Sequence, residues 1–171
     1  TRVRVGGSEP IPLLEELLIT WPDLRINIDC KSQSALQPLV EVLLRTRSLD
    51  RVCLGSFSDS RLAQLRSALG PDACTSMGPR EVASLLGRTL VGVGPRITAP
   101  KCVQVPVKQG PLRVTSRRFV EKAHTIGLHV HVWTIDDPIE MTQLLDMGVD
   151  GIMTDDTRAL RDVFRSRNLP L

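Results

Sequence analysis

The sequence predicts an α/β fold built from parallel βα units. Short apolar runs alternate along the 171 residues with segments of helical period, and successive runs begin about 22 to 30 residues apart, as in consecutive βα units. The composition is that of a globular protein, with 42% hydrophobic and 24% charged residues, which excludes wholesale disorder. With two Trp, three Phe and no Tyr, the core must be aliphatic.

The elements follow one another in order along the chain. A first helix is expected over Leu13–Trp21, with Pro12 in its first turn. The apolar runs predict six strands, at Arg25–Lys31, Arg51–Ser56, Ala73–Ser76, Cys102–Pro106, Leu128–Ile135 and Asp150–Thr154. Helical periodicity predicts helices after each of them, at Gln33–Arg45, Arg61–Leu69, Glu81–Leu86, Arg117–Thr125, Ile139–Met147 and Thr157–Arg167.

Capping residues support these boundaries. In Asp137–Glu140, an N-cap Asp, a Pro at the first helical position and a Glu at the third predict a reciprocal cap. Gly148 follows the same helix as a left-handed stop. Thr115 or Ser116 can cap the helix that carries Phe119, and Asn168 can end the last helix.

Six βα units fit either an open doubly wound sheet or an incomplete barrel. A nucleotide-binding open sheet needs a Gly-rich turn after its first strand, and Lys31–Ser34 contains no glycine. Gly92-Val93-Gly94 is followed by Pro95 and opens no helix, so the Gly- and Pro-rich stretch Val91–Lys101 is expected to be a surface loop, as is the shorter Val107–Leu112. A (β/α)₈ barrel usually needs about 250 residues. Six units therefore fit three quarters of one, as a single domain over residues 1–171.

Charge and cysteine content limit the partners and the compartment. The net charge of +3 is too small for a dedicated nucleic-acid binder, and no apolar run reaches the about 18 to 20 residues of a membrane span. The four cysteines form no CxxC pair, which favours reduced thiols and a cytoplasmic location. Because the chain begins Thr1-Arg2 without Met, we expect it to be processed or a fragment, so that secretion stays open.

The first strand carries a polar face that is suited to an anion and a cation. In Ile26–Lys31, the two Ile and Cys30 share one face, while Asn27, Asp29 and Lys31 share the other. If the apolar face packs on helices, the polar face points into a barrel. A carboxylate and an ammonium near the carboxyl end of a strand can serve a metal and a phosphate. A structural ion pair in the barrel core is the alternative.

The fifth strand places His129, His131 and Trp133 on one face. A His-x-His pair on a barrel strand can bind zinc, but such a site needs further ligands, and the remaining histidine, His124, belongs to a helix. Packed or hydrogen-bonded histidines are the simpler interpretation. Trp133 stands nearest the carboxyl end, where it can form the wall of a ligand pocket or part of the core.

Several motifs together resemble the glycerophosphodiester phosphodiesterases. The C-terminal signature of that family is matched by Val130–Asp137, Glu140-Met141, Leu144-Leu145 and Gly148–Asp155. Four further matches come in the family's order, at Pro10–Leu13 with Glu15–Leu18, at Ile26–Lys31, at Ser56-Phe57 with Leu62, and at Val103–Pro106 with Val120 and Ala123-His124. The resemblance covers nearly the whole chain.

The resemblance implies a TIM-type (β/α)₈ barrel that hydrolyses glycerophosphodiesters to glycerol 3-phosphate and an alcohol, with a divalent cation such as Mg²⁺ or Ca²⁺. The six strands would be the third to the eighth of that barrel. The family's His-Arg-Gly, Glu-x-Asp and His-Asp motifs, which carry both catalytic histidines and most of the metal site, are absent from these 171 residues. The resemblance thus places no catalytic residue in this chain. Two unpaired barrel edges would also favour self-association.

The resemblance assigns four residues to the site. Asp29 matches a metal carboxylate, although the family usually has Glu there, and Lys31 matches the lysine that contacts the phosphate. Gln104 and Trp133 match residues that line the substrate pocket. The run Thr154–Thr157 departs from the family's Thr-Asp-Arg-Pro and is expected to be a helix cap.

Three hypotheses follow from these observations. The chain is a piece of a true phosphodiesterase that is inactive by itself, or a non-enzymatic barrel remnant that binds a phosphate or a lipid headgroup, or another phosphate-handling barrel that resembles this family by convergence. The sequence upstream of Thr1 would separate the first hypothesis from the second.

Overall fold

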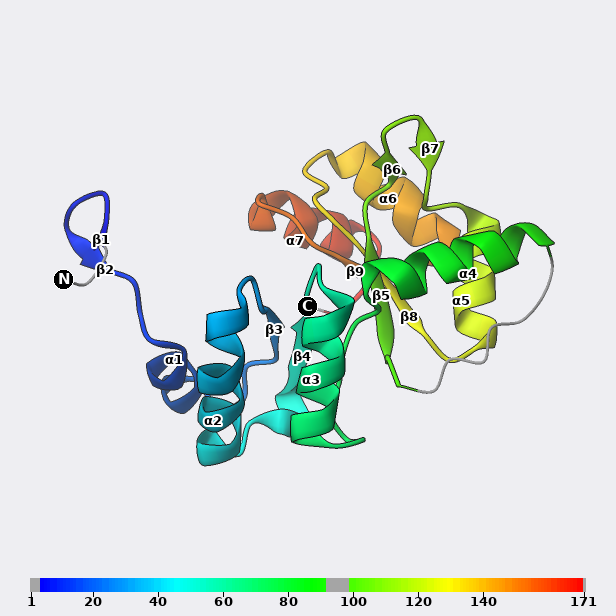
Figure 1. Cartoon of the computed structure of the whole chain (residues 1–171). Helices are drawn as coiled ribbons and strands as arrows, with labels where there is room; N and C mark the ends of the chain where they lie inside the picture. The colour runs from blue at the N-terminus through cyan, green and yellow to red at the C-terminus, as the bar shows by residue number, and fades with distance from the viewer. Residues whose placement is uncertain (1–3, 92–98, 171) are drawn as a thin grey trace. The chain divides into compact units, whose positions relative to one another are not determined.

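A computed structural model describes residues 4–91 and 99–170. The backbone forms two compact units, Thr1–Cys74 and Thr75–Leu171, each with its own parallel strands and covering helices (Figure 1). Within the described ranges, no helix combines the length and the apolar character that a membrane crossing requires. The four cysteines all lie in these ranges and form no disulfide.

The first unit is built on two parallel strands, β3 (Ile26–Asp29) and β4 (Val52–Gly55), which pair in register from Ile26 with Val52 to Asp29 with Gly55. The helices of this unit are α1 (Leu14–Thr20), α2 (Leu36–Thr46), preceded by a 3₁₀ turn at Gln33–Ala35, and α3 (Asp59–Leu69). A second 3₁₀ turn, Leu49–Arg51, leads into β4.

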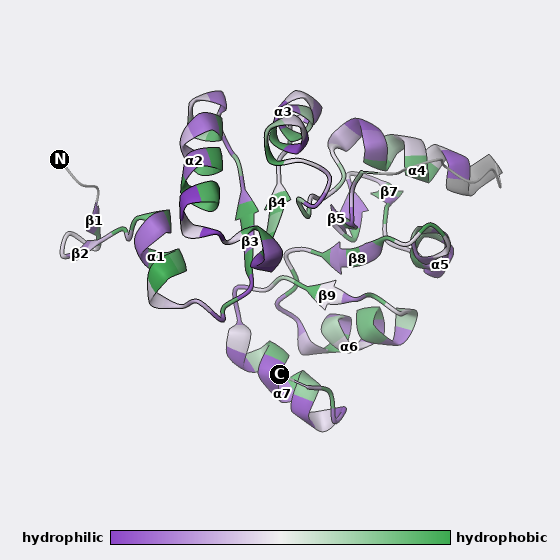
Figure 2. Ribbon diagram, turned by 90° about the horizontal axis from the view of Figure 1, so that it is seen from below, coloured by the Kyte–Doolittle hydropathy of each residue, from purple (hydrophilic) through white to green (hydrophobic). Residues whose placement is uncertain are grey.

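Helix α2 shows why these residues form a helix that packs on the strands. Its buried residues recur at spacings of three and four, so they fall on one side of the helix (Figure 2). They share a core with residues of β3, β4, α1 and α3, which comprises Leu18, Cys30, Leu36, Leu39, Val40, Leu43, Val52, Leu54 and Leu65. At about 1.5–3 kcal/mol per buried aliphatic side chain, this core is the main stabilising contribution of the unit.

Arg51 fixes the end of α1. One of its terminal nitrogens donates to the carbonyl oxygen of Leu18 at 2.6 Å, and the other donates to those of Trp21 and Leu24 at 3.1 and 2.9 Å. Carbonyl groups at a helix C-terminus lack intrahelical donors, and a guanidinium supplies them. The 3₁₀ turn before β4 thereby holds the chain that leads from α1 into β3.

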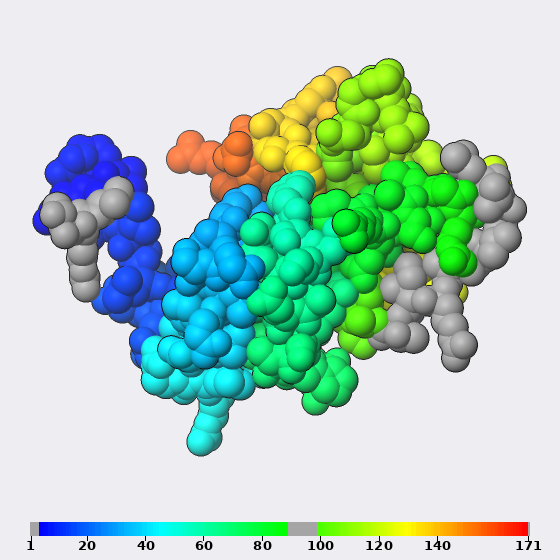
Figure 3. Space-filling model, viewed as in Figure 1, coloured from blue at the N-terminus to red at the C-terminus, as the bar shows by residue number. Residues whose placement is uncertain are grey.

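A hairpin of β1 (Arg4–Val5) and β2 (Glu9–Pro10) precedes α1. All of its residues are exposed, and in the space-filling view it stands apart from the body formed by α1, α2 and α3 of the same unit (Figure 3). The hairpin therefore contributes no side chain to the core.

The second unit has a three-stranded parallel sheet in the order β5 (Cys102–Val105), β8 (His129–Val132) and β9 (Gly151–Ile152). Its helices are α4 (Pro79–Val91), α5 (Arg117–Thr125), α6 (Pro138–Met147) and α7 (Thr157–Ser166). The core is aliphatic around Phe119, as the composition predicts. Its most deeply buried members are Leu85, Val103, Phe119, Val120, Ala123, Val130, Val132 and Met141.

Two sequence expectations on secondary structure need correction. The run Ala73–Ser76 forms no named strand, although bridges are assigned at Thr75 and at Ser76, the latter with Cys102. Its backbone still bonds to both sides, because the carbonyl oxygen of Cys74 accepts from Leu54 N and that of Thr75 accepts from Lys101 N, both at 2.9 Å. The stretch Val107–Leu112 is not an irregular loop, since β6 (Lys108–Gln109) and β7 (Leu112–Arg113) form a hairpin around Gly110. The described residues thus hold five parallel strands rather than six. Most of the predicted loop Val91–Lys101 lies outside the described residues.

The predicted caps are mostly confirmed. Asp137 accepts a hydrogen bond from the backbone N of Ile139 at 2.8 Å, although Glu140 does not return one to any described residue. Gly148 ends α6 in the left-handed region at φ 95°, where a side chain would be strained. Of the two candidates for α5, Ser116 is the cap, and Asn168 follows α7 with φ 55°.

Candidate functional site

The carboxyl end of β3 brings Asp29 and Lys31 together as predicted. Lys31 Nζ lies 2.5 Å from Asp29 Oδ2. Ile26, Ile28 and Cys30 belong to the helix-packed core of the unit, so the alternation of faces along this strand is confirmed. The pair is not a core ion pair, because 76% of the Lys31 side chain is exposed, against 28% of the Asp29 side chain. Its ammonium is therefore accessible to an anion.

Asp29 retains an unused acceptor. Its Oδ1 atom is buried and accepts no hydrogen bond from any described residue. A buried carboxylate oxygen without a donor costs free energy unless a proton donor or a cation faces it. This atom fits a role as one ligand of a hard cation such as Mg²⁺ or Ca²⁺, both of which prefer oxygen ligands.

The remaining ligands of such a cation are not present in the described part of the chain. No group of three or more His, Cys, Asp or Glu side chains in residues 4–91 and 99–170 is arranged to hold a metal ion. Asp29 therefore fits a divalent cation as a single donor. Around His129 and His131, too, no third potential ligand completes such a group within these residues.

The segment that follows β4 adds three residues beside this pair. Ser56 Oγ donates to the carbonyl oxygen of Cys30 at 2.9 Å, and Arg61 Nε donates to Ser56 Oγ at 2.9 Å. Lys31 Nζ lies 5.5 Å from the centroid of the Phe57 ring, within cation–π range. Sequence reasoning missed Arg61. The available signal was a cation in the first turn of the helix that follows Ser56-Phe57, a motif that the family resemblance matches.

In the second unit, Gln104, His131 and Gly151 lie at one level of the sheet. The register pairs Gln104 with His131 and His131 with Gly151. Gln104 Nε2 is 3.4 Å from His131 Nδ1, a weak hydrogen bond at best. Val103, Val105, Val130 and Val132 face the helix-packed core, so these polar groups occupy the opposite face.

Trp133 follows the last residue of β8 on the same face as His131. Its backbone N donates to the carbonyl oxygen of Val105 at 3.2 Å, and its side chain is half-buried. This places it at the carboxyl end of the strand, where the sequence analysis expects a pocket wall. The structure thus brings together Asp29 with Lys31 in one unit and Gln104 with His131 in the other.

The loops after β8 and β9 are joined through Asp136. Its Oδ1 atom accepts hydrogen bonds from Thr154 Oγ1 and from the backbone N of Asp155, both at 2.8 Å. The bond from Thr154, and to a smaller extent that from Asp155, lowers the pKa of Asp136 below its usual range. Asp156 caps α7 by accepting from the backbone N of Arg158 and Ala159, so the predicted role of this run as a helix cap is confirmed.

A different cluster lies at the amino end of β8. Asp150 Oδ2 accepts from the backbone N of Val130 at 2.7 Å and lies 2.8 Å from His124 Nε2, while His129 Nδ1 is 3.6 Å from Oδ1. Partial burial raises the pKa of Asp150, but the hydrogen bonds from Val130 and His124 outweigh it, so that the pKa is lowered. His124 and His129 therefore support the base of the sheet, away from its carboxyl end.

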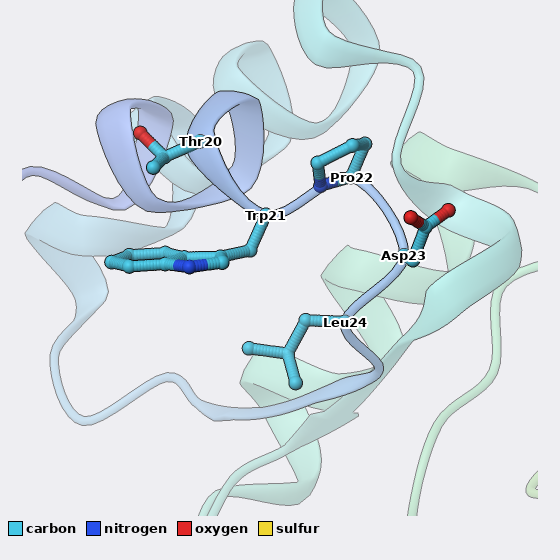
Figure 4. A pocket seen from close by; sticks show the side chains of 5 residues that line it. All are labelled: Thr20, Trp21, Pro22, Asp23 and Leu24. Atoms are coloured by element: carbon cyan, nitrogen blue, oxygen red, sulfur yellow. The ribbon is translucent and has the colours of Figure 1, made fainter.

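A shallow pocket of about 430 Å³ lies at the end of α1 and contains none of the predicted site residues. Thr20, Trp21, Pro22, Asp23 and Leu24 line it, and the side chains of Trp21 and Leu24 extend to the same side of the backbone (Figure 4). Trp21 is 54% exposed. This pocket matters for spectroscopy, because it holds the second tryptophan of the chain.

Comparisons with known proteins agree on one family. Residues 2–159 match the profile of the Glycerophosphoryl diester phosphodiesterase family. A probable glycerophosphodiester phosphodiesterase 2 of Mycobacterium tuberculosis is 38% identical over 97% of this chain and 64% of its own length. A lysophospholipase D of Mus musculus is 22% identical over 92% of this chain and 57% of its own length. The chain thus spans less than two thirds of these curated relatives.

Solved structures show the same fold. A glycerophosphodiester phosphodiesterase from Parabacteroides distasonis has a TM-score of 0.73 at 21% identity, over 98% of this chain and 69% of that one. A phosphodiesterase from Oleispira antarctica in complex with the product sn-glycerol-3-phosphate has a TM-score of 0.68 at 17% identity, over 91% of this chain and 62% of that one. This likeness confirms the α/β fold of TIM-barrel type.

Proposed function

Because the chain belongs to the glycerophosphoryl diester phosphodiesterase family, we propose that it forms part of an enzyme that hydrolyses glycerophosphodiesters to glycerol 3-phosphate and an alcohol. The observation that carries this proposal is the Asp29–Lys31 pair at the carboxyl end of β3, where TIM-type barrels bind their substrates. The product complex of the Oleispira antarctica relative supports the same class of substrate.

We infer a division of roles among the residues of this chain. Lys31 contacts the phosphate and neutralises charge that develops on its oxygens. Asp29 holds a divalent cation through its oxygens, and that cation, when bound, supplies further charge neutralisation at the phosphate. Gln104 and Trp133 are the residues that the family resemblance assigns to the lining of the substrate pocket.

The acid and the base of the reaction are proposed to lie outside these residues. A general acid must protonate the leaving alcohol and a base must activate the nucleophile. His124 and His129 surround Asp150 at the amino end of β8, and His131 lies against Gln104. We therefore expect the histidines of the family's missing motifs to supply both roles in a longer protein that contains the rest of the barrel.

The alternative is a non-enzymatic module that binds a phosphate or a lipid headgroup. The observation that favours it is that Asp29 has no neighbouring metal ligands, since no three potential ligands gather in residues 4–91 and 99–170. The family match removes the third hypothesis, that of a convergent phosphate-handling barrel.

One experiment separates the two remaining functions. The chain is extended by the coding sequence upstream of Thr1, and hydrolysis of glycerophosphocholine is measured with Mg²⁺ and with a chelator. Turnover that is lost in Lys31→Ala and in the chelator supports the enzyme. An extended protein that binds glycerol 3-phosphate through Lys31 but releases no product supports the binding module. Turnover that is unaffected by Lys31→Ala contradicts the proposed site.

A further inference from the structure

We propose that Arg61 is a second cationic contact for the phosphate of the substrate, held in place by Ser56. The inference rests on the proposed function of the Asp29–Lys31 site and adds to it a residue from the following βα unit. Neither the family resemblance nor the motif at Ser56-Phe57 assigns this arginine.

A continuous chain of hydrogen bonds locates the guanidinium beside the site. The carbonyl oxygen of Cys30, which lies between Asp29 and Lys31 in the sequence, accepts from Ser56 Oγ at 2.9 Å. Ser56 Oγ in turn accepts from Arg61 Nε at 2.9 Å. Ser56 is only 7% exposed, so this link is shielded from water and is fixed on both sides.

The guanidinium of Arg61 has N–H donors that no described residue uses. Only Nε of its side chain is used, and neither terminal nitrogen donates to any residue within the described ranges. A guanidinium carries five N–H donors in a planar fork that matches two oxygens of one phosphate. With Nε fixed, the fork is oriented before a ligand arrives, which reduces the side-chain entropy lost on binding.

The Asp29–Lys31 pair at the end of β3 carries too little net charge to attract a phosphate without a further cation. Lys31 is balanced by Asp29 at 2.5 Å, so the pair offers a phosphate little net positive charge. The structure gives Arg61 no ion pair with any described carboxylate. Its half-buried charge at the adjacent strand end therefore supplies the uncompensated cation that an anionic substrate requires.

The contribution of Ser56 is that of a positioning residue. Its hydroxyl group donates to the backbone of Cys30 and accepts from Arg61, which uses both of its hydrogen-bonding functions. Removing the hydroxyl leaves Arg61 in the chain but releases its Nε anchor. The fork would then be free to point into solvent.

The test measures binding of inorganic phosphate and glycerol 3-phosphate to the whole chain by calorimetry, with glycerol as the uncharged probe. Arg61→Ala is expected to lower the affinity for both anions by about 10-fold or more, as for the loss of a charge-assisted hydrogen bond. Arg61→Lys keeps the charge but loses the fork, so it should be intermediate. Arg66→Ala, in the last turn of the same helix, is the matched control and should bind like the wild type.

Ser56→Ala should weaken phosphate binding, and Ser56→Thr should restore it because the hydroxyl is retained. Thermal unfolding of each variant identifies any loss of fold. If Arg61→Ala does not fold, the phosphate affinity of Arg61→Lys is compared with that of the wild type instead. Equal affinity in Arg61→Ala and wild type, together with weakened binding in Lys31→Ala, overturns the inference and leaves the proposed function standing. Failure of the wild type to bind either anion contradicts both.

Discussion

The imidazole of His131 lies directly against the backbone of Gly151 on the adjacent strand. A Cβ atom placed on Gly151 would be 2.8 Å from His131 Cδ2, closer than real Cβ contacts allow. The missing side chain at position 151 is therefore what makes room for His131 at the level of Gln104.

Gly151→Ala is expected to lower the free energy of unfolding by about 1–3 kcal/mol, because the added methyl group forces His131 to move or the strands to shift. Urea denaturation measures this change. Gly87→Ala is the control, since Gly87 lies in α4 with open space around it, and the substitution there should stabilise the helix by about 0.5–1 kcal/mol. Similar effects at both positions would contradict the steric explanation.

Asp29→Ala is expected to abolish a weak binding of Mg²⁺ or Ca²⁺ to the chain. Affinity should be low even in the wild type, because one carboxylate cannot replace the six to eight oxygens that Ca²⁺ takes. Calorimetric titration of both cations tests this, with Asp72→Ala as the control at an exposed carboxylate. Equal binding by the wild type and Asp29→Ala would show that Asp29 is no ligand.

The fluorescence of Trp133 should change on addition of glycerol 3-phosphate or glycerophosphocholine, since this residue follows β8 at its carboxyl end. The measurement belongs in a Trp21→Phe background, because Trp21 is half exposed in a pocket of its own. Trp133→Phe, which leaves only Trp21, is the converse control. A constant spectrum at millimolar ligand in the Trp21→Phe protein would indicate that Trp133 belongs to the core.

Asp150→Asn should destabilise the protein near neutral pH and less so in acid. The folded-state pKa of Asp150 lies below its ordinary value. Its stabilising contribution is thus present above the unfolded-state pKa and is lost as the pH falls through the folded-state pKa. Urea denaturation of both proteins at neutral pH and at about pH 3 tests this. A difference in stability that is constant with pH would exclude the carboxylate as its cause.

The chain by itself is expected to hydrolyse no glycerophosphodiester at a measurable rate. Acid–base catalysis typically contributes about 10² to 10⁴ in rate, and the expected histidines and two of three metal carboxylates are not in this sequence. An assay with glycerophosphocholine and Mg²⁺ measures this. Turnover above the blank that disappears in Lys31→Ala would reveal catalytic residues within the chain.

Some parts of the fold could be predicted from the sequence because local signals agree with one another. Helix α5 has the predicted bounds Arg117–Thr125, since a serine cap, an amphipathic pattern and Gly127 all indicate the same ends. The alternation of faces in β3 and β8 is confirmed for the same reason, because burial on one side imposes a period of two.

Other parts carried no such signal. The strands of the β6–β7 hairpin have two residues each, all exposed, so no hydrophobic pattern indicates them. The run Ala73–Ser76 has the composition of a strand, but whether it pairs depends on neighbours distant in sequence. In the site, parity predicted the Asp29–Lys31 pair. The contact of Arg61 with Ser56 depends on a side-chain conformation that no spacing encodes.

The hydrogen bonds that Asp136 accepts from Thr154 and Asp155 have a thermodynamic consequence for recognition. They join two loops that would otherwise sample many conformations independently. Because this ordering occurs during folding, a ligand that reaches the neighbouring Trp133 meets a surface whose configurational entropy is already lost. At the proposed pocket beside Trp133, selectivity would then depend on the fit of the ligand to a fixed shape, because neither loop can rearrange alone.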